Sequence, residues 1–272
     1  SMGKKLKIGI PYMFFFHDYL PYWSTLLWEL GFDVIVSPKT NKQVKNLGLE
    51  YIYSEACLPV KVAHGHIKYL LDQGVDVLFI PSAINLTKET DEYKRSLSCP
   101  YVQTIPYVTK PITKGVYTAT PVINLSRGEE FFKRELKKAF EEFDISISEI
   151  ERAMALAQAS QDRFIRAIKS KGLEVLRETN DSNNPFIVIV GRAYNAFDLG
   201  MNLEIPKKLA NLGVTAIPMD FLPIEQVRLF EHWPNMYWRA GQRILRAAKI
   251  IAREKNLYPI FIGNFSCGPD SF

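Results

Sequence analysis

The chain has 272 residues, of which 47% are hydrophobic and 23% charged, and its formal net charge is +5. This length fits one large α/β domain or two smaller ones, with enough apolar residues for a core that needs no disulfides. Basic and acidic residues alternate along 129–177, so nothing supports nucleic-acid binding, and a slightly positive cleft for an anionic ligand explains the charge equally well.

No apolar run reaches the roughly 18–20 residues that a membrane span needs, so no membrane segment is expected. The first three residues, Ser1-Met2-Gly3, look like an addition before a native start, and no signal-peptide pattern follows them. We therefore expect a cytoplasmic protein.

In the first half of the chain, apolar runs alternate with helical patterns, which is typical of βαβ units and a parallel sheet. The predicted strands are 7–11, 32–36, 75–81 and 102–105. The predicted helices are 19–30, 42–47 and 59–73. Residues 83–100 are polar and predicted to form a loop, the kind of segment on which such folds place their sites.

Helical periodicity runs from about 128 to 177, and the polar run 180–185 then predicts a domain boundary. A second α/β set follows, with predicted strands 186–190, 214–218 and 258–263 and predicted helices 202–212 and 237–253. The expected fold is therefore α/β, with two Rossmann-like (flavodoxin-like) lobes bridged by a helical segment. The predicted domains are 4–127, 128–180 and 185–272, the last of which looks truncated at its C-terminus.

The three cysteines are Cys57, Cys99 and Cys267, an odd number spread over the whole chain. In a cytosolic protein this argues against a disulfide framework and leaves metal or cluster ligation, or buried inert thiols. All three are predicted to follow the carboxyl ends of strands and to lie next to or near proline or glycine. No C-x-x-C pair exists, so a structural zinc ribbon is not expected. Three thiolates from distant loops suit a 4Fe–4S cluster with one iron left open, but inert thiols remain the alternative.

Eight blocks of the sequence occur in a familiar order, among them "SEACLPVKVAHGH", "SCPYVQTIPY", "VGRAYNAFDLGMN" and "NFSCGPDSF". Across nearly the whole chain they resemble the acyl-CoA dehydratase activase-related proteins, a family that is itself similar to the cluster-bearing subunits of 2-hydroxyacyl-CoA dehydratases. The resemblance implies that Cys57, Cys99 and Cys267 hold a 4Fe–4S cluster. It also implies an ATP-hydrolysing activase as a partner, because this chain contains no G-x-x-x-x-G-K-[ST] loop of its own.

Cys57, Lys61 and His64 are spaced so that a helix would place them on one face. Lys61 could then offset the negative charge of a thiolate-bound cluster, and His64 could give a hydrogen bond or a proton to a bound ligand. These two residues are the catalytic candidates, against the alternative of an exposed lysine and a structural histidine. His66 falls on another face and is predicted to be structural.

Five further residues follow or end predicted strands, where α/β folds bind ligands. The candidate cofactor-binding residues are Gly9, Pro11, Arg192, Tyr194 and Asn195. Arg192 could bind a phosphate or carboxylate, with Tyr194 or Asn195 adding a hydrogen bond. The aromatic groups at 14–16 and 237–239 are predicted to be core or subunit interface, so a homodimer is a candidate assembly.

The leading hypothesis is an oxygen-sensitive iron–sulfur protein that takes part in ATP-driven, low-potential electron transfer or reductive chemistry on an acyl-CoA-like substrate. It would belong to a dehydratase- or reductase-type system, as a lyase or oxidoreductase component. Two alternatives stay open. One is a non-catalytic electron-relay or scaffold module that docks on an activase, and the other is a two-lobe small-molecule-binding protein with ordinary thiols.

Overall fold

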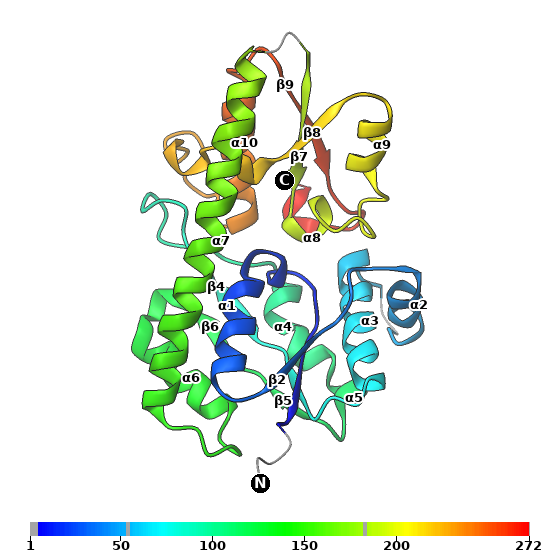
Figure 1. Ribbon diagram of the computed structural model, residues 1–272, viewed down its shortest axis with the longest axis vertical. Helices are drawn as coiled ribbons and strands as arrows, with labels where there is room; N and C mark the ends of the chain where they lie inside the picture. The colour runs from blue at the N-terminus through cyan, green and yellow to red at the C-terminus, as the bar shows by residue number, and fades with distance from the viewer. Residues whose placement is uncertain (1–4, 53–54, 182–183, 272) are drawn as a thin grey trace. The chain divides into compact units, whose positions relative to one another are not determined.

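The computed structural model describes residues 5–52, 55–181 and 184–271. Ser54, with which the cysteine-bearing block begins, and part of the polar boundary at 182–183 lie outside these residues. The chain is an α/β protein with parallel sheets, as the sequence predicts (Figure 1). It divides into two compact units: the first is formed by the residues up to Leu86 together with Ser98–Asp162, and the second by Thr87–Leu97 and Arg163–Phe272.

The first unit contains a four-stranded parallel sheet with the strand order β2-β1-β3-β5. Its strands are β1 (Lys7–Ile10), β2 (Asp33–Val36), β3 (Val77–Phe79) and β5 (Tyr117–Ala119). The helices α1 (Phe16–Glu29), α2 (Lys42–Glu50) and α3 (Leu58–Asp72) connect the first three strands. A separate parallel pair, β4 (Ser82–Asn85) with β6 (Val122–Asn124), was not predicted.

The predicted strand at 102–105 is wrong, because these residues lie within helix α4 (Pro100–Val108). The β-branched residues Val102 and Ile105 suggested a strand, but they are three apart and both are buried on one helix face. Pro100 stands in the first turn, where its fixed φ angle favours a helix start. The fourth strand of the sheet is β5 instead, after the short helix α5 (Lys110–Thr113).

An aromatic cluster fills the core of the first unit. The rings of Phe79 and Phe140 stack in parallel with centroids 6.2 Å apart, and Trp23 lies 5.1 Å from Phe79. Phe32 lies 5.5 Å from Phe140, which joins the end of α6 (Glu129–Ala139) to the start of β2. Such ring pairs add stabilisation beyond their buried area. The unit therefore has a large apolar core of its own.

The helical segment predicted for 128–177 consists of α6 and the long helix α7 (Ile147–Asp181). The division between the two units falls within α7, after Asp162. In the first unit Gln161 joins α7 to α1, because its amide nitrogen donates to the Asp18 carbonyl at 2.8 Å and its amide oxygen accepts from the Tyr22 N–H at 3.2 Å.

The second unit contains a three-stranded parallel sheet with the order β8-β7-β9. The central strand is β7 (Phe186–Gly191), flanked by β8 (Thr215–Pro218) and β9 (Leu257–Ile262). The helices of this part are α8 (Ala193–Ala196), α9 (Ile205–Asn211) and α10 (Arg239–Ile251). Both sheets thus place the first strand in the centre and the next two on opposite sides. In such sheets ligands bind at the carboxyl ends of the strands where the order reverses.

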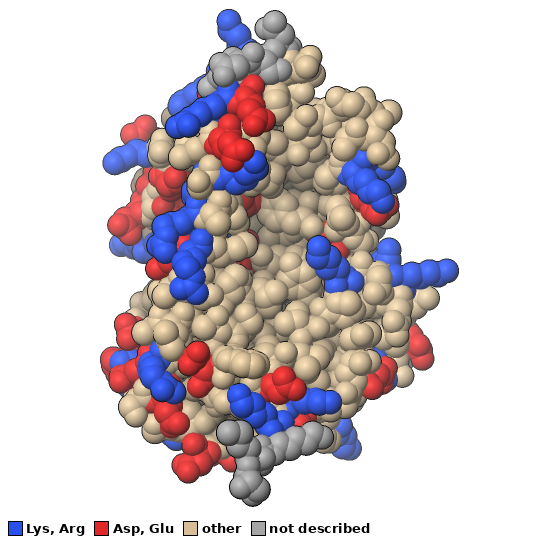
Figure 2. All heavy atoms as spheres, viewed as in Figure 1, with Lys and Arg blue, Asp and Glu red and all other residues tan. Residues whose placement is uncertain are grey.

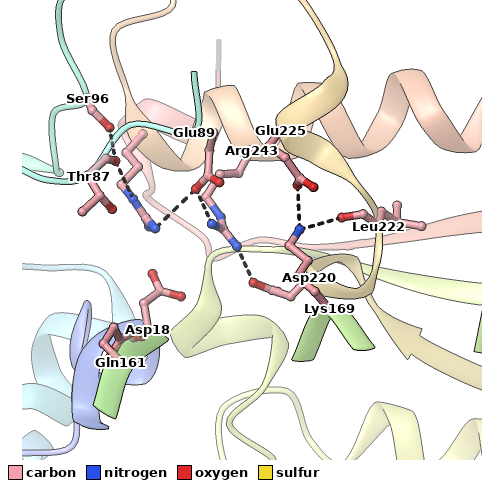
Figure 3. A network of polar contacts seen from close by, with 11 residues as sticks. Asp18, Thr87, Glu89, Ser96, Gln161, Lys169, Asp220, Leu222, Glu225 and Arg243 are labelled. Atoms are coloured by element: carbon pink, nitrogen blue, oxygen red, sulfur yellow. Dashed lines mark hydrogen bonds and ion pairs between the residues drawn. The ribbon is translucent and has the colours of Figure 1, made fainter. Parts of the chain in front are cut away.

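The segment Thr87–Leu97, hereafter the strap, leaves the first unit and packs against α10 of the second (Figure 3). Glu89 pairs with Arg243, which also pairs with Asp220, and Arg239 lies 3.5 Å from Glu89. Nearby, Lys169 pairs with Glu225 at 2.7 Å. The strap ends in backbone hydrogen bonds of Leu97 with Tyr237 and Arg239, both at 2.9 Å. These contacts fix the residues directly before Ser98 and Cys99.

Basic and acidic side chains are interspersed on the face seen in Figure 2, in line with the interleaved charges of the sequence. Within the described residues, none of the helices has the length and apolar character needed to cross a membrane.

Candidate functional site

Each of the three cysteines stands at the residue where a helix begins. Cys57 precedes α3, Cys99 precedes α4, and Cys267 precedes a short 3₁₀ helix at Gly268–Asp270. A proline occupies the first or second position of each of these helices. Free N–H groups and the helix dipole at such positions stabilise a thiolate, most strongly at the two longer helices. All three cysteines are described, and none of them forms a disulfide.

The segment that carries Cys57 joins two helices that approach closely. A Cβ atom added to Gly65 of α3 would lie 1.9 Å from the Val44 carbonyl oxygen of α2, and one added to Gly48 would lie 2.1 Å from the Lys61 carbonyl oxygen. Only glycine allows this contact, since any side chain would collide with the backbone. The crossing therefore fixes the helices on both sides of Cys57.

The catalytic candidates lie on α3 after Cys57. Lys61 is half-buried, and its backbone N–H lies 3.4 Å from the Cys57 carbonyl oxygen. His64 is buried, and its Nδ1 lies 2.8 Å from the Val60 carbonyl oxygen, so Nδ1 carries the proton and Nε2 keeps its lone pair. Burial lowers the pKa of His64, although the hydrogen bond to Val60 acts in the opposite direction.

His66 lies between two hydroxyl groups, as a structural histidine would. Its Nδ1 is 2.8 Å from Ser37 Oγ and its Nε2 is 3.0 Å from Thr40 Oγ1. Its side chain is fully buried, and burial, with a smaller effect from His17, lowers its pKa to about 3. It therefore joins α3 to the end of β2 as a neutral ring.

Cys99 is buried and held beside β4 by its neighbours. The Ser98 backbone N–H donates to the Ile84 carbonyl at 3.0 Å, and the Ser98 hydroxyl donates to the Ala83 carbonyl. Gln103 donates its side-chain amide to the Ser98 carbonyl at 2.9 Å. The backbone before Cys99 is thus fixed from two sides, by β4 and by the first turn of α4.

The loop that carries Cys267 is held by hydrogen bonds within the loop. Ser266 adopts a left-handed backbone with φ of 64°, which is strained for a residue other than glycine. The Ser271 hydroxyl donates to the Cys267 carbonyl at 2.6 Å, and the Cys267 N–H donates to the Asn264 carbonyl at 3.2 Å. The chain therefore turns sharply after β9 and presents Cys267 in a fixed conformation.

A buried ion pair joins this loop to the end of β7. Arg192 Nε lies 2.9 Å from both carboxylate oxygens of Asp270, and one terminal nitrogen lies 2.7 Å from Oδ1. Both side chains are only 6% exposed. Beside them, a Cβ on Gly191 would lie 2.6 Å from the Ile262 carbonyl, so β7 and β9 end in close contact. The structure thus places Arg192, predicted to bind an anionic ligand, on a carboxylate of its own chain.

The electrostatics of this loop favour a neutral thiol in the described chain. Burial raises the pKa of Cys267 to about 11, even though the Arg192 guanidinium acts to lower it. Burial by itself would lower the pKa of Arg192, but Tyr194 and Asp270 outweigh it and raise that pKa. Arg192 therefore stays charged and keeps its bond to Asp270.

The other ligand candidates lie at the carboxyl ends of the central strands. In the second unit, Tyr194 is half-buried and Asn195 is buried, both in α8 directly after β7. In the first unit, Gly9 lies within β1, where an added Cβ would be 3.1 Å from Leu70, and buried Pro11 follows the strand. Gly9 thus packs against α3, while Pro11 accepts a hydrogen bond from the Met13 N–H at 2.8 Å.

The donor set fits a metal cluster in its chemistry. Cysteine thiolates are the usual ligands of iron–sulfur clusters. Each of the three cysteines, Cys57, Cys99 and Cys267, stands where a helix begins. Cys57 and Cys99 belong to the first unit and Cys267 to the second. Within the part of the chain that is described, no three His, Cys, Asp or Glu side chains are grouped so that they could hold a metal ion.

Sequence reasoning missed the residues that position the site. Asp270 was passed over as part of a loop, although its spacing of three residues from Cys267 places it at the end of the same turn. Arg239, Arg243 and Arg246 recur at the spacing of one helix face, and acidic Glu89 and Glu92 mark their partners in the strap. The spacing of the three arginines could therefore have indicated this group of ion pairs from the sequence.

The fold and these residues define an α/β protein with two parallel sheets and cysteines at helix starts. Residues 7–222, well over half of the chain, match the family described as the CoA enzyme activase uncharacterised domain. The chain belongs to this family. A search among curated proteins finds no significant match.

Proposed function

We propose that this protein is the cluster-bearing electron-transfer component of a system related to the 2-hydroxyacyl-CoA dehydratases. The observation that carries the proposal is the threefold repetition of cysteine, helix start and proline at Cys57, Cys99 and Cys267. Chance placement would put cysteines in strands and on apolar helix faces, where small hydrophobic side chains pack. Membership of a CoA enzyme activase family fits the same proposal.

Cys57, Cys99 and Cys267 would hold a 4Fe–4S cluster, which supplies one-electron chemistry when it is bound. The Gly48–Gly65 crossing holds the helices around Cys57, and the Arg192–Asp270 pair holds the Cys267 loop. Cys57 and Cys267 therefore each stand in a segment with a defined conformation.

Two residues of α3 would act on a bound ligand. His64 keeps a lone pair on Nε2 because its Nδ1 proton is donated to the Val60 carbonyl, so Nε2 can accept a proton or a hydrogen bond. Lys61 places a positive charge one turn after Cys57, where it would offset negative charge on thiolates. An ATP-hydrolysing activase would supply the electron, and an acyl-CoA-like molecule would receive it.

The decisive experiment is anaerobic purification and reconstitution with iron and sulfide. The expected result is close to four irons and four sulfides per chain and a broad absorbance near about 400 nm. Cys57→Ser, Cys99→Ser and Cys267→Ser should each lower the iron content sharply, while Ser170→Ala on the exposed face of α7 should not. A colourless, iron-free wild-type protein after this treatment would refute the proposal.

Alkylation separates the proposal from its main competitor. If the thiols hold a cluster, modification of all three cysteines before reconstitution prevents iron uptake. If the protein is instead a ligand-binding protein with ordinary thiols, the apoprotein never takes up iron, whether or not its thiols are blocked. Iron analysis of the blocked and unblocked samples distinguishes the two.

A further inference from the structure

Two buried asparagines follow β7 in the second unit. Asn195 is 1% exposed and Asn202 is 2% exposed. Asn202 donates its side-chain nitrogen to the Ala196 carbonyl at 2.8 Å. Asn195 Nδ2, Asn195 Oδ1 and Asn202 Oδ1, however, have no hydrogen-bond partner among the residues that the structure describes. Three polar atoms within eight residues are thus buried without a partner.

Burial of these three polar atoms lowers the stability of the fold unless another group forms hydrogen bonds with them. A buried polar group without a hydrogen bond loses its hydration and gains nothing, and three such groups remove a sizeable part of the stability of a small domain. The asparagines also stand where ligands bind in this class of sheet, at the carboxyl end of the central strand. Asn195 is bonded through its backbone N–H to the Arg192 carbonyl at 2.8 Å, so it is fixed to the residue that holds the Cys267 loop.

The unpaired atoms define the chemistry of what they bind. Asn195 offers one acceptor and two N–H donors, and Asn202 adds a second acceptor. Exchanging O and N of Asn195 leaves this inventory unchanged, because both atoms are unpaired. The orientation of Asn202 is set by Ala196, since a carbonyl can only receive an N–H. A group that complements these atoms therefore carries at least one N–H or O–H donor as well as an acceptor.

An anion does not meet this requirement. A carboxylate or phosphate has no donor, so the two asparagine oxygens would face further oxygen atoms. Arg192, the nearest cation in the sequence, is already bonded in bidentate fashion to Asp270. The end of β7 is thus built for a neutral polar group.

We propose that Asn195 and Asn202 form a subsite that binds a neutral amide group of a small ligand, with hydrogen bonds in both directions. The inference rests on the proposed function for its choice of ligand, because the pantetheine arm of an acyl-CoA molecule carries two amides. The subsite would take the pantetheine portion, and the phosphates would bind elsewhere.

The test compares the two portions of coenzyme A as separate probes, by isothermal titration calorimetry. Pantetheine should bind the wild-type protein, and Asn195→Leu should weaken this binding about tenfold or more by removing both of its polar atoms. Asn211→Leu, at an exposed asparagine of α9, should leave it unchanged. Adenosine 3′,5′-bisphosphate should show no response to Asn195→Leu.

Thermal unfolding gives an independent readout. Without ligand, Asn195→Leu should unfold at a higher temperature than the wild type, because the substitution replaces unpaired polar atoms by an apolar side chain of similar size. Asn195→Ala provides a second variant should leucine prevent folding, with the same loss of pantetheine binding expected.

Absence of pantetheine binding to the wild type, or equal binding to Asn195→Leu, would overturn the inference. So would a lowered unfolding temperature of Asn195→Leu, which would indicate that the asparagine completes a structural water network. Iron content after reconstitution separates this outcome from the proposed function. Asn195→Leu should keep its iron, so loss of pantetheine binding alone concerns the subsite only.

Discussion

The two units bury polar groups in opposite ways. In the first unit, the buried ring of His66 has a hydroxyl partner at each nitrogen, and an aromatic cluster around Phe79 forms the core. In the second unit, an apolar core around Val188 and Leu222 packs on the three-stranded sheet, and buried ion pairs, Arg192 with Asp270 and Arg246 with Glu92, are added to it. Apolar packing therefore supports the sheet in both units, and the second unit adds buried ion pairs to it.

This difference indicates what each unit is built for. Buried ion pairs seldom add stability over well-packed apolar residues, but removal of one partner is costly. A unit that keeps them gains fixed positions for the loops they join. In the second unit these loops are the strap and the Cys267 segment, so we interpret the ion pairs as positioning elements.

The largest expected effect comes from breaking the pair at the end of β7. Arg192→Met leaves Asp270 buried and unpaired, and it should lower the free energy of unfolding by about 3–5 kcal/mol. Hydrogen exchange should locate the loss in β7 and β9 and leave β1 and β3 protected. The double variant Arg192→Met with Asp270→Leu should recover most of the stability. A single variant as stable as the wild type would contradict the positioning role.

The corresponding test in the first unit is the helix crossing. Gly65→Ala places a methyl group against the Val44 carbonyl and should lower the free energy of unfolding by about 1–3 kcal/mol or more, because backbone has to move. Gly268→Ala, where an added methyl group meets no atom within 4 Å, serves as the control. Equal thermal unfolding of both variants would show that α2 and α3 separate easily.

A comparable effect is expected from the strap. Burial opposes ionisation of Glu89, but Arg243 and Arg239 outweigh it and lower the pKa of Glu89. Glu89→Gln removes the charge between these arginines and should cost about 1–3 kcal/mol. Faster exchange of the Leu97 and Arg239 amides would report release of the strap. Glu231→Gln on the exposed surface should leave both amides unchanged.

The smallest effect concerns pH and the first unit alone. The pKa of His66 is about 3 in the folded chain, below the ordinary value of 6.5, so the unfolded chain binds more protons between these values. The contribution of neutral His66 to the free energy of unfolding is therefore complete above about pH 6.5. Below that pH it falls by about 1.4 kcal/mol per pH unit. Urea unfolding at pH 7.0 and 5.5 measures the loss, and His66→Gln should reduce this dependence. An unchanged slope would assign the titration to other groups.

Much of the architecture could be read from residue patterns. Apolar runs such as 186–190 and the helical periodicity of 128–177 predicted the parallel sheets and the long helices, because both depend on local spacing. The helix start at Cys57 was predicted for the same reason, whereas Cys99 and Cys267 were expected in loops that follow strands, and the structure places each of them at the start of a helix. The strand predicted at 102–105 failed because β-branched residues at a spacing of three fit a helix as well.

The tertiary structure decided the roles that depend on distant partners. Arg192 reads as an anion-binding residue in the sequence, and only the fold brings Asp270, 78 residues away, onto its guanidinium. Likewise, no local pattern reveals that Asn195 is buried without a hydrogen-bond partner among the described residues, or that Gly48 and Gly65 let two helices touch. Local sequence thus determined most of the helices and strands, whereas burial and long-range pairing determined which polar groups remain available for a ligand.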